Sequence, residues 1–364
     1  MKQREATTRS KQKGKRLLAL DAARGLAVIG MYIQHFALNR YNANIVSGNT
    51  MILFILCSGI SYSIMSRNAA DKGIEEKTFR TRILARSVFI DFLGYLLIML
   101  NGPFAVVLTA YAVLFVMGLL LKNCSDKILM IASGISFIAS PVIMIMGMSI
   151  FSGSAMLQDI AGGPLSAVAL LPVFTAGMLI GRKDLRNFKR QIGYVGAGIF
   201  MVVVIKLLSA YVLPHLSEKV MNIMMKTQNY SEINEYAPFP QNVYPISWHL
   251  ICVAAPQNGS TFTLILGMGV SLIVLGGMCL IERKIPVVLK PFSLAGQIAL
   301  TLYAIQIILG WLLALLGAEY DFIGSMFLGD IMVAVLTIVL GVILVRWKDV
   351  LIEGIMRRFE RLFS

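Results

Sequence analysis

Charge is what this sequence most lacks. Only 14% of its 364 residues are charged, whereas 57% are hydrophobic. This composition excludes an ordinary soluble domain of the same length, whose surface would need many more charged side chains. The apolar residues come in blocks of roughly 18–25, the length that crosses the hydrocarbon core of a bilayer. The sequence therefore predicts an all-α, polytopic membrane helix bundle.

Cysteine and histidine are also scarce, with four and three residues. The cysteines are scattered, and only Cys252 is expected on the outer side, so a disulfide framework is excluded. His249 and Cys252 share a zinc-like spacing, but no further ligand type lies near them in the sequence. We therefore predict no metal site.

The formal net charge of +14 does not indicate a nucleic-acid partner. Nearly all Lys and Arg residues lie in short stretches between apolar blocks, and they do not alternate with aromatic residues as in a nucleic-acid platform. This distribution is typical of the positive-inside rule, by which basic loops stay in the cytoplasm. We expect a cell membrane protein, and the composition fits a bacterial plasma membrane.

Ten transmembrane helices are predicted, at 17–38, 45–66, 84–100, 103–121, 128–150, 164–181, 192–213, 261–281, 291–315 and 326–346. An even number places both termini in the cytoplasm, in agreement with the basic loops. The predicted organisation is a basic cytoplasmic N-terminus (1–16), a transmembrane domain (17–346) with a long outer loop (214–260), and an amphipathic cytoplasmic tail (347–364) that follows the headgroups.

Ionisable side chains inside membrane helices are costly, so each one is a functional candidate. In the first predicted helix, Asp21, Arg24, Val28, Met31 and His35 fall on one stripe. Arg24 and His35 are about 17 Å apart along the helix axis, so Arg24 lies toward the cytoplasm and His35 toward the outer side. A histidine can act as base and then as acid. The alternative is that these groups only lock the helix into the bundle.

Other polar residues are weaker candidates. Ser58 in the second helix could face His35, and Arg82 with Arg86 could bind phosphate. Asp91 and Lys206 could form an intramembrane pair. Gln257 and Asn258 of the outer loop, with Tyr303 and Gln306 of the ninth helix, complete the candidate substrate-binding residues.

The opening run from Arg16 through Asp21, Arg24 and Gly25 to Met31 and His35 resembles the start of the heparan-α-glucosaminide N-acetyltransferase-like membrane proteins. It also resembles the wider acyltransferase-3 enzymes, in which an arginine and a histidine occupy similar positions on the first helix. Phe54 to Ser61, and Gly296 to Tyr303 with Gln306, are similar to related bacterial membrane proteins. Arg82 and Arg86 only approximate the paired-arginine motif of acyltransferase-3, and Gln257 stands where relatives often carry histidine.

The resemblance implies that an acyl group, often acetyl, passes from cytoplasmic acyl-CoA to a sugar or glycan on the far side. Arg24 and His35 would be the functional pair, with His35 catalytic and acetyl-CoA as the acyl donor. The expected partners are the lipid bilayer, the acyl-CoA and the glycan acceptor, and a homodimer is left open. Two other classes also stay open: a multi-pass transporter or flippase without acyl transfer, and a non-catalytic scaffold or sensor whose outer loop binds a partner.

Overall fold

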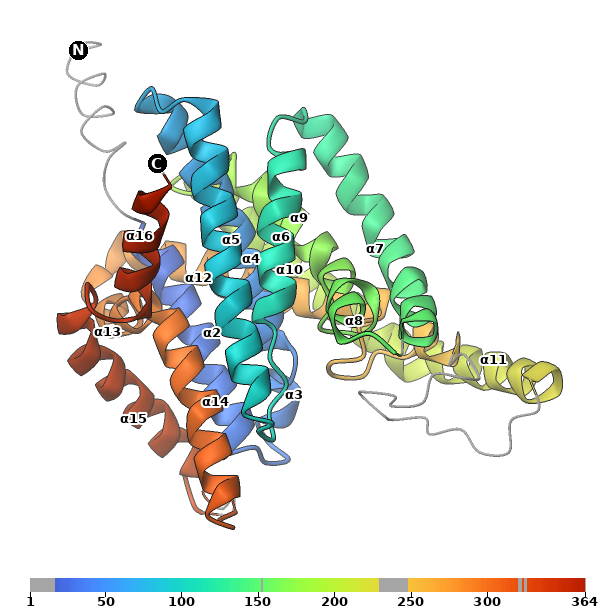
Figure 1. Ribbon diagram of the computed structural model, residues 1–364. Coiled ribbons are helices and arrows are strands. Elements are labelled where there is room, and N and C mark those ends of the chain that lie inside the picture. Colours follow the sequence, from blue (N-terminus) through green and yellow to red (C-terminus); the bar gives the residue numbers. More distant parts are fainter. Residues whose placement is uncertain (1–16, 152, 229–247, 320–322, 324–325, 364) are drawn as a thin grey trace.

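The structure is a computed structural model that describes residues 17–151, 153–228, 248–319, 323 and 326–363. This part of the chain is all-helical and contains no strand (Figure 1). Five helical stretches are long and apolar enough to cross a membrane: Ala43–Asp71, Asp126–Ile150, Phe188–Tyr211, Thr261–Lys284 and Gly329–Leu362. A bent pair of helices, Pro286–Gln297 and Ala299–Leu315, makes a sixth if it is taken as one span.

The helices follow one another along the chain with short connections. Their bounds are α2 (Leu18–Phe36), α3 (Ala43–Val46), α4 (Asn49–Asp71), α5 (Glu76–Met99), α6 (Leu108–Leu121), α7 (Asp126–Ile150), α8 (Ala155–Ala161), α9 (Ala167–Gly181), α10 (Phe188–Tyr211), α11 (Leu213–Gln228), η1 (Trp248–Cys252), α12 (Thr261–Lys284), α13 (Pro286–Gln297), α14 (Ala299–Leu315), α15 (Gly329–Leu344), η3 (Val345–Trp347) and α16 (Ile352–Leu362).

Each of the ten predicted ranges contains a helix in the structure, although ten membrane spans are not established by it. The main difference lies in the range 291–315, where the chain bends by 65° at Ile298 between α13 and α14. Hydropathy is continuous across this bend, so an apolar pattern alone predicted one helix. The predicted basic N-terminus (1–16) lies outside the described residues.

The predicted outer loop is also partly helical, because α11 occupies its first third. Its buried residues, Leu213, Ser217 and Met224, recur at helical spacing and face the protein. Pro214 does not prevent the helix, since proline is tolerated in a first turn. Residues 229–247 of this loop lie outside the described part of the chain.

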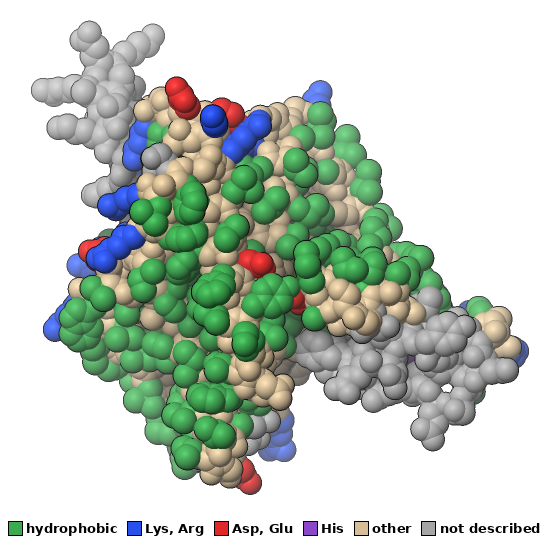
Figure 2. Space-filling model, viewed as in Figure 1, with side chains coloured by type: hydrophobic (Ala, Val, Ile, Leu, Met, Phe, Trp, Pro, Cys, Tyr) green, Lys and Arg blue, Asp and Glu red, His purple; other side chains and the backbone are tan. Residues whose placement is uncertain are grey.

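α2 begins and α16 ends at the same end of the bundle (Figure 1). The Lys and Arg side chains gather mainly at this end, where Figure 2 shows them in blue. We call it the basic end; it includes Arg67, Arg80, Arg82, Lys122 and Arg182. The opposite end, where α2 and α14 finish and α4 begins, is called the far end.

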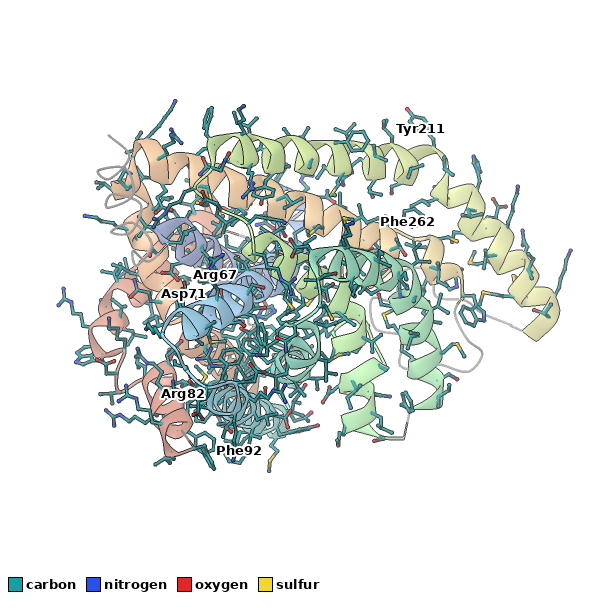
Figure 3. All side chains as sticks on the ribbon, turned by 90° about the horizontal axis from the view of Figure 1, so that it is seen from above. Arg67, Asp71, Arg82, Phe92, Tyr211 and Phe262 are labelled. Carbon is teal, nitrogen blue, oxygen red and sulfur yellow. The ribbon has the colours of Figure 1, made fainter. Side chains whose placement is uncertain are left out.

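Much of the outer surface is hydrophobic, as a membrane helix bundle requires (Figure 2). On α5, exposed apolar side chains recur every four residues, at Leu84, Val88, Phe92 and Leu96. Phe92 and Tyr211, on α5 and α10, point outward at opposite edges of the molecule in Figure 3. These stripes are the surfaces that would face lipid.

α2 lies at the centre of the bundle, packed against α4, α12, α13, α14 and α15. Its contact with α13 is the closest. A Cβ on Gly25 would lie 1.9 Å from the Phe292 carbonyl oxygen, and a Cβ on Gly296 would lie 1.8 Å from the Asp21 carbonyl oxygen. The two backbones can touch only because both positions are glycine, as in other small-residue membrane interfaces.

We expect Gly25→Ala to destabilise the protein by about 2–3 kcal/mol, because the added methyl group would force the two backbones apart. Gly277→Ala on α12 is the matched control, since a Cβ there meets nothing within 4 Å. It should be neutral or slightly stabilising. Thermal unfolding of the two purified variants checks this, and equal melting temperatures would contradict the proposed close approach.

Candidate functional site

Arg24 is held at the basic half of α2 by three groups from three helices. Its guanidinium lies 3.5 Å from the Asp21 carboxylate, donates to the Ser61 hydroxyl at 2.6 Å, and donates to the Gly296 carbonyl at 3.5 Å. The predicted pairing of Asp21 and Arg24 is therefore confirmed. The Gly296 carbonyl is at the C-terminal end of α13, where a cation is favoured by the helix dipole.

Ser58 lies near this arginine, so its predicted approach to His35 is wrong. α2 and α4 are antiparallel: Arg24 meets Ser61, while Gly30 meets Thr50 nearer the far end. This register places Ser58 level with the Arg24 half of α2. The Ser58 hydroxyl donates to the Ile55 carbonyl at 2.7 Å.

A tyrosine that the sequence did not single out joins the same region. The buried Tyr111 hydroxyl of α6 lies beside Ser58 and within electrostatic reach of both Arg24 and Arg86. We call Asp21, Arg24, Ser58, Ser61 and Tyr111 the arginine cluster. It is a set of polar groups within the bundle, assembled from α2, α4 and α6.

Arg86 is engaged by the chain's own C-terminal helix. Its guanidinium donates to both carboxylate oxygens of Glu360, at 2.7 and 3.2 Å, and Phe359 contacts Phe89 on the same face of α5. Arg82 lies one turn earlier and forms no ion pair within the described residues. Figure 3 looks onto the basic end and places Arg82 toward its rim. The two predicted phosphate-binding arginines thus have different surroundings.

The middle of the predicted stripe is closed by hydrophobic packing. Val28 and Met31 are 0% and 5% exposed and belong to the main core with Leu53 and Phe54 of α4. The polar groups of the predicted stripe are therefore separated by an apolar layer between Arg24 and His35. The helical spacing predicted that all five residues share one face of α2. It could not show how tightly α4 packs over the apolar middle of that face.

His35 lies at the far end of α2, against the segment that joins α5 and α6. Its ring stacks on Phe104 with centroids 4.0 Å apart and planes 10° from parallel. Phe104 also contacts Phe36 edge-on. The Nδ1 atom of His35 is buried and has no hydrogen-bond partner among the described residues. The imidazole is therefore oriented by packing against Phe104.

Tyr303 and Gln306 of α14 lie at the same end but differ in their contacts. The Tyr303 hydroxyl accepts from the Val107 amide at 3.0 Å, so it anchors the segment that carries Phe104. Tyr303 therefore helps to position the segment between α5 and α6. Gln306 is 0% exposed, and neither polar atom of its side-chain amide has a hydrogen-bond partner in the part of the chain that the structure describes.

The two candidates of the outer loop, Gln257 and Asn258, also differ in their contacts. Asn258 is buried and binds its own loop: it donates to the Leu250 carbonyl at 3.0 Å and accepts from the Ser260 amide at 2.7 Å. These hydrogen bonds give Asn258 a structural part within the loop, and its predicted substrate contact stays a prediction. Gln257, at φ 59°, lies beside Gly48 at the start of α4. Since the Gly48 amide donates to Gln34, Gln257 comes close to the far end of α2.

The predicted pair between Asp91 and Lys206 does not form. Lys206 is exposed on α10, and no ion pair joins it to Asp91 in the described chain. The two residues were expected to pair because both lie within predicted membrane helices. The sequence contains no information on which of these helices are neighbours.

Two carboxylates that the sequence analysis did not single out cap helix ends. Glu282 of α12 accepts from the Leu18 and Ala19 amides, at 3.3 and 2.9 Å, and so caps α2. Glu353 of α16 accepts from the Thr301 amide at 3.0 Å and its hydroxyl at 2.5 Å, and so caps α14 beside the bend. Glu353 and Glu360 dock the predicted amphipathic tail onto α14 and α5, respectively.

Surface pairs complete the basic end. Hydrogen bonds from Lys122 and Arg80 hold the pKa of Glu76 below its usual value. The Arg182 guanidinium donates to the carbonyls of Cys124 and Lys122 at 2.7 and 2.9 Å, which closes the turn after α6.

Within the described residues, no group of three His, Cys, Asp or Glu side chains is placed to hold a metal ion.

No protein-family model matches this chain, and no curated protein sequence matches it. The resemblance carried by the opening motif therefore stays a prediction, and the case for function depends on the site itself.

We expect Glu360→Gln or Arg86→Met to lower the unfolding free energy by about 1–2 kcal/mol, because each leaves a largely buried charge without its partner. The double variant should lose less than the sum of the two, with a coupling of about 1 kcal/mol measured by chemical or thermal unfolding. Arg80→Met is the control: its pair with Glu76 is exposed and should contribute only about 0.3–0.5 kcal/mol. Additive losses at Arg86 and Glu360 would show that the pair does not stabilise α16.

Proposed function

We propose that this protein is a membrane-embedded acyltransferase that moves an acyl group, acetyl in the simplest case, from cytoplasmic acyl-CoA to an acceptor at the far side. One observation carries the proposal. A single central helix presents a fixed arginine near the basic end and, eleven residues later, an oriented imidazole with a free nitrogen at the far end.

The donor would enter from the basic end, because its nucleotide carries phosphates that require cations. Arg24 is already oriented by Asp21 and Ser61, and Arg82 is free of ion pairs within the described residues. Arg86 could join only if Glu360 released it. The rise of about 17 Å from Arg24 to His35 is comparable to the length of a pantetheine arm.

At the far end, His35 would act as the general base. It would take the proton from an acceptor hydroxyl or amine as that oxygen or nitrogen attacks the thioester carbonyl carbon. Collapse of the tetrahedral intermediate breaks the carbon–sulfur bond, and the histidinium returns its proton to the departing CoA sulfur. The products are an acyl ester or amide and free CoA. A sugar or glycan is the acceptor class that the opening motif favours.

The hydrophobic layer between the two ends sets a requirement for this function. Val28 and Met31 separate Arg24 from His35 in the structure, so α2 and α4 must part at this level to admit a pantetheine arm. The packed state described here would be the resting state, in which the bundle is closed to leakage. Transfer would then depend on the donor stabilising an open state.

A transporter or flippase remains the second candidate, and one observation favours it. Broken helices are typical of secondary transporters, and α13 and α14 form a broken pair with a 65° bend next to Arg24. A substrate anion could bind at such a break. We rank this second because the break is occupied by Glu353 and Arg24, and it does not involve His35.

We expect His35→Ala to lower acyl transfer by about 10²–10⁴-fold while leaving acetyl-CoA binding intact, because it removes the base and not the phosphate site. Arg24→Ala should instead weaken acetyl-CoA binding. Transfer of radiolabelled acetyl groups and thermal stabilisation by acetyl-CoA measure the two effects separately. His215→Ala, on the exposed surface of α11, is the control and should match the parent protein. Undiminished transfer by folded His35→Ala would remove the role given to His35.

Reconstituted liposomes distinguish the two candidates. We expect protein with acetyl-CoA outside and acceptor inside to acetylate the acceptor across the bilayer, with the protein inserted so that its basic end faces the donor. Without an acyl donor, we expect no accumulation of solute. Donor-independent uptake, unchanged in His35→Ala and lost in Arg24→Ala, would favour the transporter.

A further inference from the structure

Gln306 is the least satisfied polar side chain at the far end. It is 0% exposed, and within the described residues neither its amide nitrogen nor its amide oxygen has a hydrogen-bond partner. A buried carboxamide without partners costs folding free energy, because the hydrogen bonds that it would make with water are not replaced. Residues kept at such a cost are often functional.

Its neighbours on α14 show where the side chain is directed. Leu302, one turn before it, accepts at 2.8 Å from the Tyr32 hydroxyl of α2. Gly310, one turn after it, faces Phe104, whose ring carbon would lie 2.2 Å from an added Cβ. Each step of four residues rotates by about 40° and rises about 6 Å, so Gln306 lies midway between them in both angle and height.

The same layer contains His35. Its ring stacks on Phe104, and it follows Tyr32 by about one turn on α2. Gln306 is therefore directed toward the junction of Tyr32 and Phe104, where His35 also lies. By this register, the Gln306 amide and the His35 Nδ1 atom lie at a similar level of the bundle, and both are buried without a partner among the described residues.

We propose that Gln306 is a catalytic residue whose amide N–H binds the carbonyl oxygen of the acyl thioester beside His35. The inference rests on the proposed function and adds to it an oxyanion donor. When the acceptor attacks the carbonyl carbon, negative charge develops on that oxygen, and the Gln306 N–H donates a hydrogen bond to it. No proton leaves the amide, and the charge returns to the carbon–oxygen double bond as the CoA sulfur departs.

The substitution Gln306→Met keeps the volume of the side chain and removes its polar atoms. We expect transfer to fall by about 10²–10³-fold in kcat, as for other single oxyanion donors, while the affinity for acetyl-CoA changes less than about threefold. We also expect the melting temperature to rise by about 2 °C or more, because an unsatisfied buried amide is replaced by an apolar group. If Gln306 were only structural, its replacement would not lower kcat and raise the melting temperature at the same time.

Gln191 offers the matched control. It is also a buried glutamine in a long helix. Its amide nitrogen donates to the Leu185 carbonyl at 2.9 Å, whereas its amide oxygen has no partner among the described residues, so it differs from Gln306 by one hydrogen bond. Gln191→Met should therefore lower the melting temperature and leave kcat unchanged. The opposite signs of the two temperature shifts test the burial argument without any reference to acyl transfer.

Infrared difference spectra supply the direct measurement. With acetyl-CoA labelled with ¹³C at the carbonyl carbon, we expect the carbonyl band to shift to lower frequency on binding to the parent protein, and the shift to be lost in Gln306→Met. Unchanged kcat in that variant, an unshifted band, or a lower melting temperature with a parallel loss of transfer would each overturn the proposal. If the parent protein neither binds nor transfers acetyl groups, the proposed function fails as well, whereas failure at Gln306 alone leaves it standing.

Discussion

The backbone contact between α2 and α13 is the constraint on which the rest of the structure depends. Gly25 and Gly296 let the two helices touch, and this contact keeps α2 at the centre of the bundle. It also brings the last carbonyls of α13 to the guanidinium of Arg24. A side chain at either glycine would move α2, and with it both the arginine cluster and His35. The geometry of the candidate site therefore follows from two residues that carry no functional group.

The same contact explains why the bend at Ile298 is tolerated. A break inside a membrane bundle exposes unpaired backbone groups, and each needs a partner in a medium without water. Arg24 binds a carbonyl at the end of α13, and Glu353 binds the amide of Thr301 at the start of α14. The two charges match the dipoles of the two helix ends. The tail that supplies Glu353 is thus part of the bundle and explains how a broken helix can be stable there.

Side-chain pairs between residues close in the sequence were predictable, whereas contacts between distant segments were not. The pairing of Asp21 with Arg24 followed from a spacing of three residues. The partners Ser61, Glu353 and Glu360 come from distant segments, and no periodicity indicates which helices are neighbours. For the same reason the expected pair of Asp91 with Lys206 was wrong. Apolar patterns located the helices but concealed the bend at Ile298, because hydropathy does not change there.

The two ends of α2 differ in a way that bears on mechanism. Toward the basic end two arginines have partners: Arg24 has Asp21 and Ser61, and Arg86 has Glu360. At the far end, the Nδ1 atom of His35 and the amide of Gln306 are buried and have no partner among the described residues. Matched charges stabilise the bundle, whereas buried polar groups without partners lower its stability. The hydrophobic layer of Val28 and Met31 keeps the two ends apart. A ligand that reaches from the cations to the unmatched groups would therefore supply the free energy needed to open that layer.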